Sequence, residues 1–319
     1  MRNLGGFFIL QKKRSIVSKV PFEKPAVSYE KQLKKLSSRG MEFSNITDDA
    51  ALQLLSSIGY YRLSAYWYPF RQRRGFQILS DFKPNTQFTK IKALYEFDRT
   101  LRLLIMDAIE RIEIMVRTQI NHNLTLKYGV FAHADSVNFH KNFRHTQWLS
   151  RVSKEVERSN DDFIKHFEQK YDGYPTVPLW CTTEVMSLGN LSRMYKGLLH
   201  EDKKSIANYF NIHPKRLTDW LHVITYIRNA CAHHSRLWNR SLSIRPHKVK
   251  DPLWQSQDTL QNNRIFYILL ILRFLMHASG NESNWKQQIE KLMEQWSDDE
   301  NVLKMMGVPS NWKNHPIWK

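Results

Sequence analysis

A long helical pattern over residues 89–127 limits the fold of this chain more than any other feature. Its apolar residues recur at the 3.6-residue spacing of an α-helix, so that they fall on one stripe. The stripe consists of Leu94, Leu101, Ile105, Ala108, Ile112 and Val116. Alternation of apolar and polar residues, the pattern of half-buried strands, is nearly absent from the sequence. We therefore predict an all-α fold.

Shorter helical patterns and breaks divide the rest of the chain. They predict helices over residues 29–38, 48–57, 145–171, 183–199, 202–210, 214–232, 257–278 and 284–296. Residues 75–88 contain Gly75, Pro84 and Asn85 and are predicted to form a loop. We expect four parts along the chain: a basic tail (1–24), an N-terminal helical module with an aromatic and arginine-rich segment (25–85), a helical core (86–280) and a C-terminal helical extension (281–319).

The charge of the chain favours a polyanionic partner. Lys and Arg number 48 against 30 Asp and Glu, a formal net charge of +18, which favours nucleic acid or an anionic membrane surface. The longest apolar run, Ile265 to Leu272, is too short to span a bilayer. The two cysteines, Cys181 and Cys231, cannot build a disulfide framework and fit a reducing compartment. We therefore expect a soluble cytoplasmic protein that carries no cofactor.

The predicted helix 214–232 places a cation among apolar residues. On a helical projection its apolar face contains Leu217, Trp220, Leu221, Ile224 and Cys231. Arg228 falls within about 20° of Leu217, in the middle of that face. A guanidinium there is costly unless it is paired or faces a polar cavity. It is either satisfied by a carboxylate or carbonyls of its own chain, with Glu184 as one candidate partner for Arg228 or Arg236, or it binds a phosphate bidentately.

Two histidines follow this arginine, His233 and His234. On a straight helix His233 points about 140° away from Arg228, so one ideal helix does not bring both side chains to one atom. Either the helix loosens between Cys231 and His233, or a second chain completes the site. The second possibility predicts a homodimer.

Arginine and histidine together suit metal-free cleavage of RNA. The 2′-OH of the substrate attacks the adjacent phosphorus, a base takes its proton, and an acid protonates the leaving 5′-oxygen. Histidine transfers protons near neutral pH, Arg228 would stabilise the phosphate, and Asn229 would orient the histidine or a phosphate oxygen. The spacing alone is weak evidence, since Arg117/His122, Arg216/His222 and Arg240/His247 also match it. A metal site from Cys231, His233 and His234 lacks the usual ligand spacing.

The surroundings of Arg228 resemble a known family. The string Arg228-Asn229, Ala232-His233-His234 and Arg236-Leu237-Trp238-Asn239 is similar to that of the Abi-like proteins of the AbiD and AbiF type, bacterial abortive-infection proteins that act against phage. Further segments resemble the same family in the same order, over roughly residues 25–275: Gly59 to Tyr66, Phe97 to Arg102, Glu110 to Glu113 with Arg117, Pro178 to Trp180, and Glu184 to Gly189.

This resemblance implies a fold and an activity. The family is related to HEPN domains, helical bundles whose Arg-x4–6-His motif cleaves RNA when two domains pair. Carried over, Arg228 and His233 match the Arg and His of the motif, Asn229 matches its polar residue, and His234 is structural or auxiliary. The resemblance therefore implies a HEPN-like helical bundle that acts as a dimeric, metal-independent endoribonuclease toxin leaving 2′,3′-cyclic phosphates. It also implies a small structured RNA as an antitoxin.

A second set of residues is a candidate for RNA binding. Residues 59–76 interleave aromatic side chains with arginines, a combination that stacks on bases beside phosphate contacts. We select Tyr61, Arg62, Arg71, Arg73 and Arg74 from this segment, and Arg236 from the string after Arg228, as RNA-binding candidates. In the alternative, the aromatic side chains pack between helices and the arginines are solvated.

Two other functions stay open at this point. The chain is a non-catalytic RNA-binding module if the same motif binds RNA without cutting it; its RNA affinity would then depend steeply on salt. A DNA-binding regulator would need a recognition helix with an outward basic face, and no convincing one is visible in the sequence.

Overall fold

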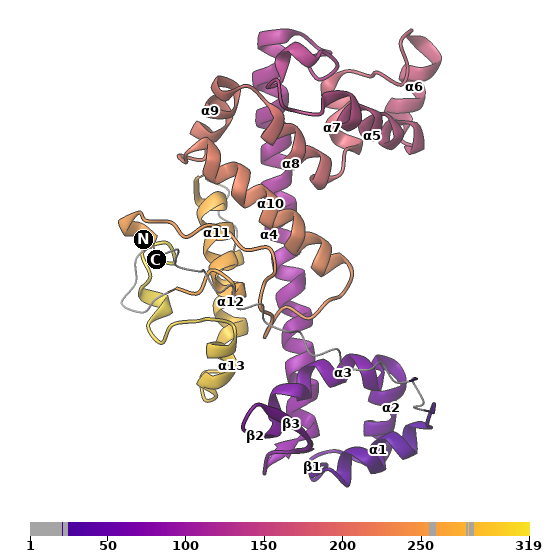
Figure 1. The fold of residues 1–319 in the computed structure, drawn as a ribbon, viewed down its shortest axis with the longest axis vertical. Coiled ribbons are helices and arrows are strands. Elements are labelled where there is room, and N and C mark those ends of the chain that lie inside the picture. Colours follow the sequence, from indigo (N-terminus) through magenta and orange to yellow (C-terminus); the bar gives the residue numbers. More distant parts are fainter. Residues whose placement is uncertain (1–20, 22–24, 255–259, 279, 281–283) are drawn as a thin grey trace, which may run out of the picture. The chain divides into compact units, whose positions relative to one another are not determined.

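The computed structural model describes residues 21, 25–254, 260–278, 280 and 284–319. The chain divides into two compact units, residues 1–90 and 91–319. Helices dominate both units (Figure 1), which confirms the all-α prediction. Apart from Pro21, the basic tail predicted for residues 1–24 lies outside the described residues.

The first unit contains three short helices, α1 (Tyr29–Ser37), α2 (Asp48–Ile58) and α3 (Tyr60–Trp67). The side chains of Ser28 and Thr47 accept hydrogen bonds from first-turn amides and so fix the starts of α1 and α2. The apolar interior of the unit contains the buried side chains of Leu33, Leu36, Leu55, Leu63 and Trp67.

Two small sheets complete the first unit, and they correct the sequence prediction. Strand β1 (Met41–Glu42) pairs in parallel with β4 (Thr86–Gln87), and β2 (Arg71–Arg74) pairs antiparallel with β3 (Gln77–Phe82). The loop predicted for residues 75–88 is therefore wrong over most of its length. Gly75, with φ of 58°, lets the chain reverse between β2 and β3. The four polar residues of β2 lack the alternation by which strands are recognised.

Helix α4 (Phe88–Tyr128) begins in the first unit and continues into the second. All six residues of its predicted apolar stripe are buried, with at most 1% of any side chain exposed. The other helices of the second unit are α5 (His145–Arg158), α6 (Asp162–Lys170), α7 (Leu179–Val185), α8 (Leu188–Gly197), α9 (His200–Tyr209), α10 (Pro214–Ala232), α11 (Ile265–Ala278), α12 (Trp285–Glu294) and α13 (Glu300–Met305). Short 3-10 turns occur at Tyr68–Phe70, Ser136–Asn138, Pro252–Trp254 and Trp312–Asn314.

Two predicted helices are each divided by a serine. The pattern over 145–171 is broken after Arg158, where the hydroxyl of Ser159 donates to Asp161 and accepts its backbone N–H. The pattern near 183–199 is broken before Ser187, whose hydroxyl caps α8. Side-chain hydrogen bonds to nearby groups therefore decide these boundaries.

Helix α11 is the most apolar helix of the second unit and is buried over most of its length. Every residue from Ile265 to Leu272 is buried, so this apolar run is core packing. Helix α10 packs against α8 and α9 (Figure 1). The indole N–H of Trp285 on α12 donates to the carbonyl of Leu104 on α4 over 2.7 Å, which ties the last helices to the long one.

Candidate functional site

Helix α10 has the bounds and the buried face that its sequence predicts. It begins at Pro214, whose fixed φ suits the first helical position, and it ends at Ala232. The predicted apolar face is buried in full: Leu217, Trp220, Leu221, Ile224 and Cys231. This packing fixes the rotation of α10 and so determines where its polar side chains emerge.

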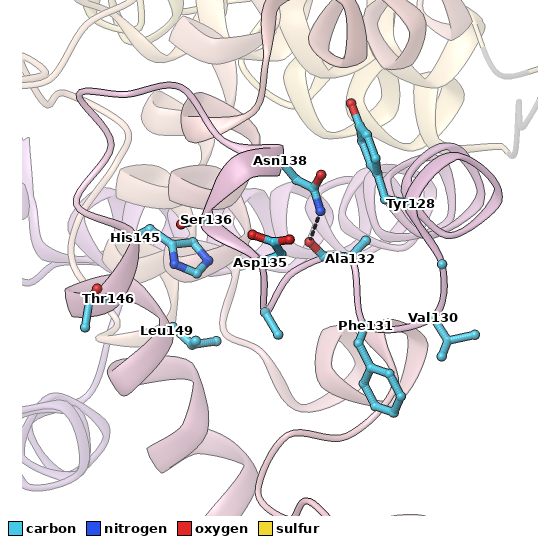
Figure 2. Close-up of a pocket in the computed structure, with 12 residues that line it drawn as sticks. Tyr128, Val130, Phe131, Ala132, Asp135, Ser136, Asn138, His145, Thr146 and Leu149 are labelled. Carbon is cyan, nitrogen blue, oxygen red and sulfur yellow. Dashed lines mark hydrogen bonds between the residues drawn. The ribbon is translucent and has the colours of Figure 1, made fainter.

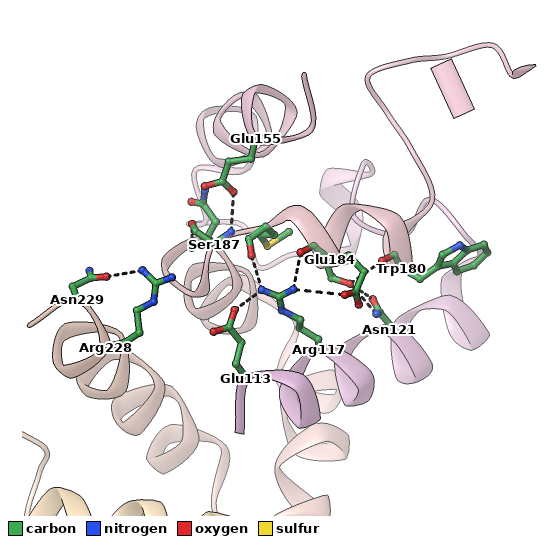
Figure 3. Close-up of polar contacts among 12 residues, drawn as sticks. Glu113, Arg117, Asn121, Glu155, Trp180, Glu184, Ser187, Arg228 and Asn229 are labelled. Atoms are coloured by element: carbon green, nitrogen blue, oxygen red, sulfur yellow. Dashed lines mark hydrogen bonds and ion pairs between the residues drawn. The ribbon is translucent and has the colours of Figure 1, made fainter. Parts of the chain in front are cut away.

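Arg228 lies on the same face but, unlike the apolar residues around it, is only half-buried. Its Nη1 donates to Oδ1 of Asn229 over 3.4 Å (Figure 3), a weak contact. Within the described residues it forms no ion pair with a carboxylate. Of the two possibilities that the sequence left open, burial against a carboxylate of its own chain is therefore not what the structure contains.

The guanidinium of Arg228 borders a pocket of about 480 Å³ whose other walls come from α4. Three carboxylates line this pocket, those of Asp107, Glu110 and Glu113. Asp107 pairs with Arg111 at 3.0 Å and Glu113 pairs with Arg117, while Glu110 is exposed and has no ion pair within the described residues. Two of the three negative charges are thus neutralised beside Arg228.

Arg117 has a structural role across the same pocket. Its guanidinium donates to the carbonyls of Glu184 and Met186, at 2.8 and 2.9 Å, and contacts the carboxylate of Glu184 at 3.9 Å (Figure 3). The suggestion that Glu184 pairs with Arg228 or Arg236 is therefore wrong, because the spatial neighbour of Glu184 is a residue of α4. Both terminal nitrogens of Arg117 are bonded, to Glu113 and to carbonyls at the end of α7 and just after it, which argues against Arg117/His122 as a catalytic pair.

His233, the second candidate catalytic residue, lies at the C-terminal end of α10. His233 is the C-cap residue and its backbone N–H donates to the carbonyl of Asn229 over 3.0 Å. Next, the N–H of His234 donates to Cys231 and that of Ser235 to Ala230, the bonding pattern of a Schellman motif. The helix therefore does not loosen before His233: its N–H still forms the i→i−4 hydrogen bond, so the angle between Arg228 and His233 expected from a straight helix stands.

Both histidine side chains are exposed, but their backbones differ. His234 has a φ of 54°, the left-handed region that glycine usually occupies at this position. The side chain of His233 has no hydrogen bond or ion pair within the described residues. His233 thus carries a free imidazole at the end of the helix that carries Arg228.

A buried carboxylate of α4 holds the segment that follows. Asp98 is fully buried; its oxygens accept the backbone N–H of Leu237 at 3.0 Å and of Trp238 at 2.7 Å, and they pair with Arg102 at 2.5 Å. The indole of Trp238 donates to the carbonyl of Val302 over 2.9 Å. The turn carrying His233 is therefore bounded by α10 on one side and by an anchored loop on the other.

No metal centre accompanies this site in the part of the chain that the structure describes: no three His, Cys, Asp or Glu side chains gather there as ligands. Burial raises the pKa of the Cys231 thiol to about 12, so the free thiol stays protonated near neutral pH.

A larger hollow of the second unit, of about 940 Å³, lies between the end of α4 and the start of α5 (Figure 2). Its titratable side chains are already used within the fold. Asp135 accepts the N–H of Val137 at 3.0 Å, and Nε2 of His145 lies 2.9 Å from the carbonyl of His133. His133, whose carbonyl contacts His145, is itself buried, and this burial lowers the pKa of its imidazole to about 4. We do not place the functional centre there.

The RNA-binding candidates of the first unit fall into two groups. Tyr61 is 91% exposed, and Arg62, Arg73 and Arg74 are exposed. Arg71 is half-buried and lies 5.8 Å from the ring centroid of Tyr68. By contrast Tyr66 and Trp67 are buried, so the packing alternative holds for those aromatic residues. Arg236 belongs to the second unit and is half-buried.

Sequence reasoning missed the acidic wall of the Arg228 pocket. Asp107, Glu110 and Glu113 are spaced three residues apart and therefore share a face of α4. That spacing was visible in the sequence, but nothing in it connects this face with a helix more than 100 residues later. The role of Asp98 was hidden for the same reason.

Comparison with known proteins identifies the family. The family model described as Abi-like protein matches residues 53–239. The chain belongs to the Abi-like family. Membership supports a role in abortive infection, the defence of bacteria against phage. No curated protein and no solved structure matches the chain.

The Abi-like match covers the features described above. It begins within α2, contains the β2–β3 hairpin and the acidic face of α4, and ends at Asn239, just after the loop that Asp98 anchors. Among the described residues, no helix combines the length and the apolar character needed to cross a membrane.

Proposed function

We propose that this Abi-like protein is a phage-defence toxin that cleaves RNA without a metal ion, in a cytoplasmic homodimer of HEPN-like helical bundles. The observation that carries the proposal is the combination at the end of α10. Arg228 borders a pocket and has no carboxylate partner within the described residues, and an exposed His233 follows at the turn.

The chemistry assigns one role to each side chain. The 2′-oxygen of the substrate bonds to phosphorus and loses its proton to a base, and the bond from phosphorus to the 5′-oxygen breaks as an acid protonates that oxygen. Arg228 stabilises the negative charge on the phosphate, His233 transfers protons, and Asn229, bonded to Arg228, orients the guanidinium. The products carry a 2′,3′-cyclic phosphate and a 5′-hydroxyl.

A dimer supplies the second proton-transfer group that this chemistry needs. One His233 cannot be base and acid in the same step, but two copies bring two. Apolar residues beside Arg228 support this arrangement, because Leu103 and Ile114 of α4 line the same pocket and are 56% and 55% exposed. Apolar side chains next to a polar site are typical of an interface.

The deciding experiment compares three variants of the purified protein on a labelled RNA in EDTA. We expect His233→Ala and Arg228→Ala to abolish cleavage, while His234→Ala, a change of the neighbouring imidazole, retains it. Circular dichroism checks that each variant is folded. Full cleavage by His233→Ala, or loss of cleavage in EDTA, contradicts the proposal.

A non-catalytic RNA-binding module is the second candidate function, favoured by the exposed Arg73, Arg74 and Tyr61 of the first unit. Under this alternative, wild type and His233→Ala bind RNA equally and neither cleaves it. RNA that copurifies with the protein provides the substrate for both assays. A small structured RNA in that fraction would be the candidate antitoxin that the family resemblance implies.

A further inference from the structure

A third pocket of the second unit has a volume of about 690 Å³ and is lined by five cationic side chains. Arg193 and Lys196 come from α8, Lys215 and Arg216 from the first turn of α10, and Lys248 from the loop before α11. Three segments that are distant in sequence thus bring five positive charges to one hollow, and α8 and α10 lie side by side in Figure 1.

The pocket contains a single carboxylate, and it is already engaged. Oxygens of Asp219 accept the backbone N–H of His247 at 2.9 Å and contact Nδ1 of His247 at 2.8 Å. Asp219 therefore holds the 247–249 loop against α10. None of the five cations forms an ion pair within the described residues. Clustered like charges repel one another, so this surface is suited to a polyanion.

The lining also indicates which part of a polyanion is bound. No Phe, Tyr or Trp side chain lines the pocket; its rings are the imidazoles of His213, His222 and His247, which offer a smaller stacking surface. Flexible Lys and Arg side chains around an open hollow contact phosphates irrespective of sequence. Five cations against a single carboxylate fit the repeated charges of a sugar-phosphate backbone better than a single nucleotide.

We propose that this pocket is a separate RNA-backbone site, which anchors the strand away from the cleavage centre; the inference rests on the proposed function for the choice of RNA. Arg216 and Arg228 are twelve residues apart, about 18 Å along α10. Asp219 and Arg228 lie on roughly opposite sides of that helix. The same helix thus carries a backbone anchor in its first half and the candidate catalytic arginine in its second.

The test compares two triple variants with equal loss of charge, both in a His233→Ala background so that cleavage plays no part. The pocket variant is Arg193→Gln, Lys196→Gln, Lys215→Gln. The control is Lys154→Gln, Arg158→Gln, Lys165→Gln, three cations of α5 and α6 outside the pocket. Fluorescence anisotropy measures binding of two single-stranded 20-mers of different sequence at salt concentrations from about 50 to about 200 mM, a range over which phosphate contacts change affinity strongly.

We expect the pocket variant to bind both 20-mers more weakly, by about fivefold at about 0.1 M salt for each phosphate that its side chains no longer bind. Its plot of log affinity against log salt becomes less steep by about 0.7 for each such phosphate, and the control stays within about twofold of the parent. Equal effects in both variants overturn the inference, because only net charge then matters. ATP binding is measured in the same way. If the parent binds ATP and the pocket variant does not, while the RNA affinity of the pocket variant is unchanged, the inference is also overturned, because the pocket is then a nucleotide site. Neither result depends on whether wild type cleaves RNA.

Discussion

The two halves of α10 are built alike but buried differently. Beside each half a carboxylate holds a loop by accepting a backbone N–H. Asp98 of α4 holds Leu237 and Trp238 after the C-terminal half, and Asp219 of α10 itself holds His247 beside the N-terminal half. Asp98 is fully buried and also pairs with Arg102, whereas the side chain of Asp219 is 18% exposed and its partner His247 is 92% exposed.

This difference matches the tasks that we propose for the two halves. Proton transfer requires atoms held within a fraction of an ångström, and a buried, multiply bonded carboxylate provides that rigidity. Contacts to a phosphate backbone tolerate mobile side chains and an exposed loop. The comparison predicts that changes at the C-terminal half act on catalysis and folding, and that changes at the N-terminal half act on affinity.

The largest expected effect is at the cleavage centre. Arg228→Ala removes the phosphate cation and should lower the cleavage rate by about 10²- to 10³-fold; His233→Ala removes a proton-transfer group and should lower it by about 10²- to 10⁴-fold. Single-turnover cleavage of a labelled RNA measures both rates. The control variant Lys154→Gln, Arg158→Gln, Lys165→Gln should cleave at the rate of wild type. If Arg228→Ala or His233→Ala cleaves RNA at the rate of wild type, the proposed difference between the two halves of α10 is wrong.

Second, the two loop-holding carboxylates should differ in their effect on stability. Asp98→Ala removes the buried carboxylate that pairs with Arg102 and accepts two backbone N–H groups, and should cost about 3–5 kcal/mol of unfolding free energy. Asp219→Ala removes a partly exposed contact and should cost about 1 kcal/mol or less. Urea unfolding followed by circular dichroism compares them. Equal losses would show that burial does not distinguish the two halves.

Third, acid should destabilise the fold independently of His233. Burial lowers the pKa of His133 to about 4, so the unfolded state binds the extra proton between about pH 6.5 and pH 4. The contribution of His133 to stability is therefore complete above about pH 6.5 and falls by up to about 3 kcal/mol as pH drops through that window. Urea midpoints measured against pH should fall less in His133→Gln. If the pH dependence of the urea midpoint is unchanged in that variant, other groups cause the loss of stability at low pH.

Fourth, the basic hairpin of the first unit should contribute to RNA affinity but less than the pocket. Arg73→Gln with Arg74→Gln removes two exposed cations and should weaken binding by about fivefold at about 0.1 M salt for each phosphate that is no longer bound. The control cations of α5 and α6 again set the baseline in anisotropy titrations. A larger loss of affinity than in the pocket triple variant would make the hairpin the main RNA-binding surface.

The smallest effect is expected at the turn after α10. His234→Gly replaces a side chain at φ of 54° by the residue that this conformation favours. Unfolding free energy should rise by up to about 1 kcal/mol, and cleavage should persist because His233 remains. Thermal unfolding and the cleavage assay measure the two outcomes. Lost cleavage would transfer the proton-transfer role to His234.

Local signals in the sequence predicted most helices, and long-range contacts account for what they missed. The bounds of α10 follow from Pro214 and the apolar spacing before Ala232, and the buried stripe of α4 follows from its periodicity. The β2–β3 hairpin was missed because Arg71 to Arg74 carry no alternating pattern, so that pairing with Gln77–Phe82 alone makes them a strand.

The candidate site likewise has residues that the sequence predicted and contacts that it did not. Arg228, Asn229 and His233 lie within six residues, so a local string carries them and the family resemblance assigns their roles. Asp98 meets Trp238 across 140 positions of sequence, and the basic pocket draws on three separate segments. Periodicity and spacing within a single sequence do not predict such long-range contacts, because these contacts depend on how the helices pack.

The hydrogen bond from Trp238 to Val302 has a consequence for the chain during its own synthesis. Asp98 and the Arg228–His233 string leave the ribosome well before residue 302, so a nascent chain lacks the last partner of the loop until most of the polypeptide has emerged. Chains that end before residue 302 would therefore carry Arg228 and His233 beside a loop that lacks one of its hydrogen bonds.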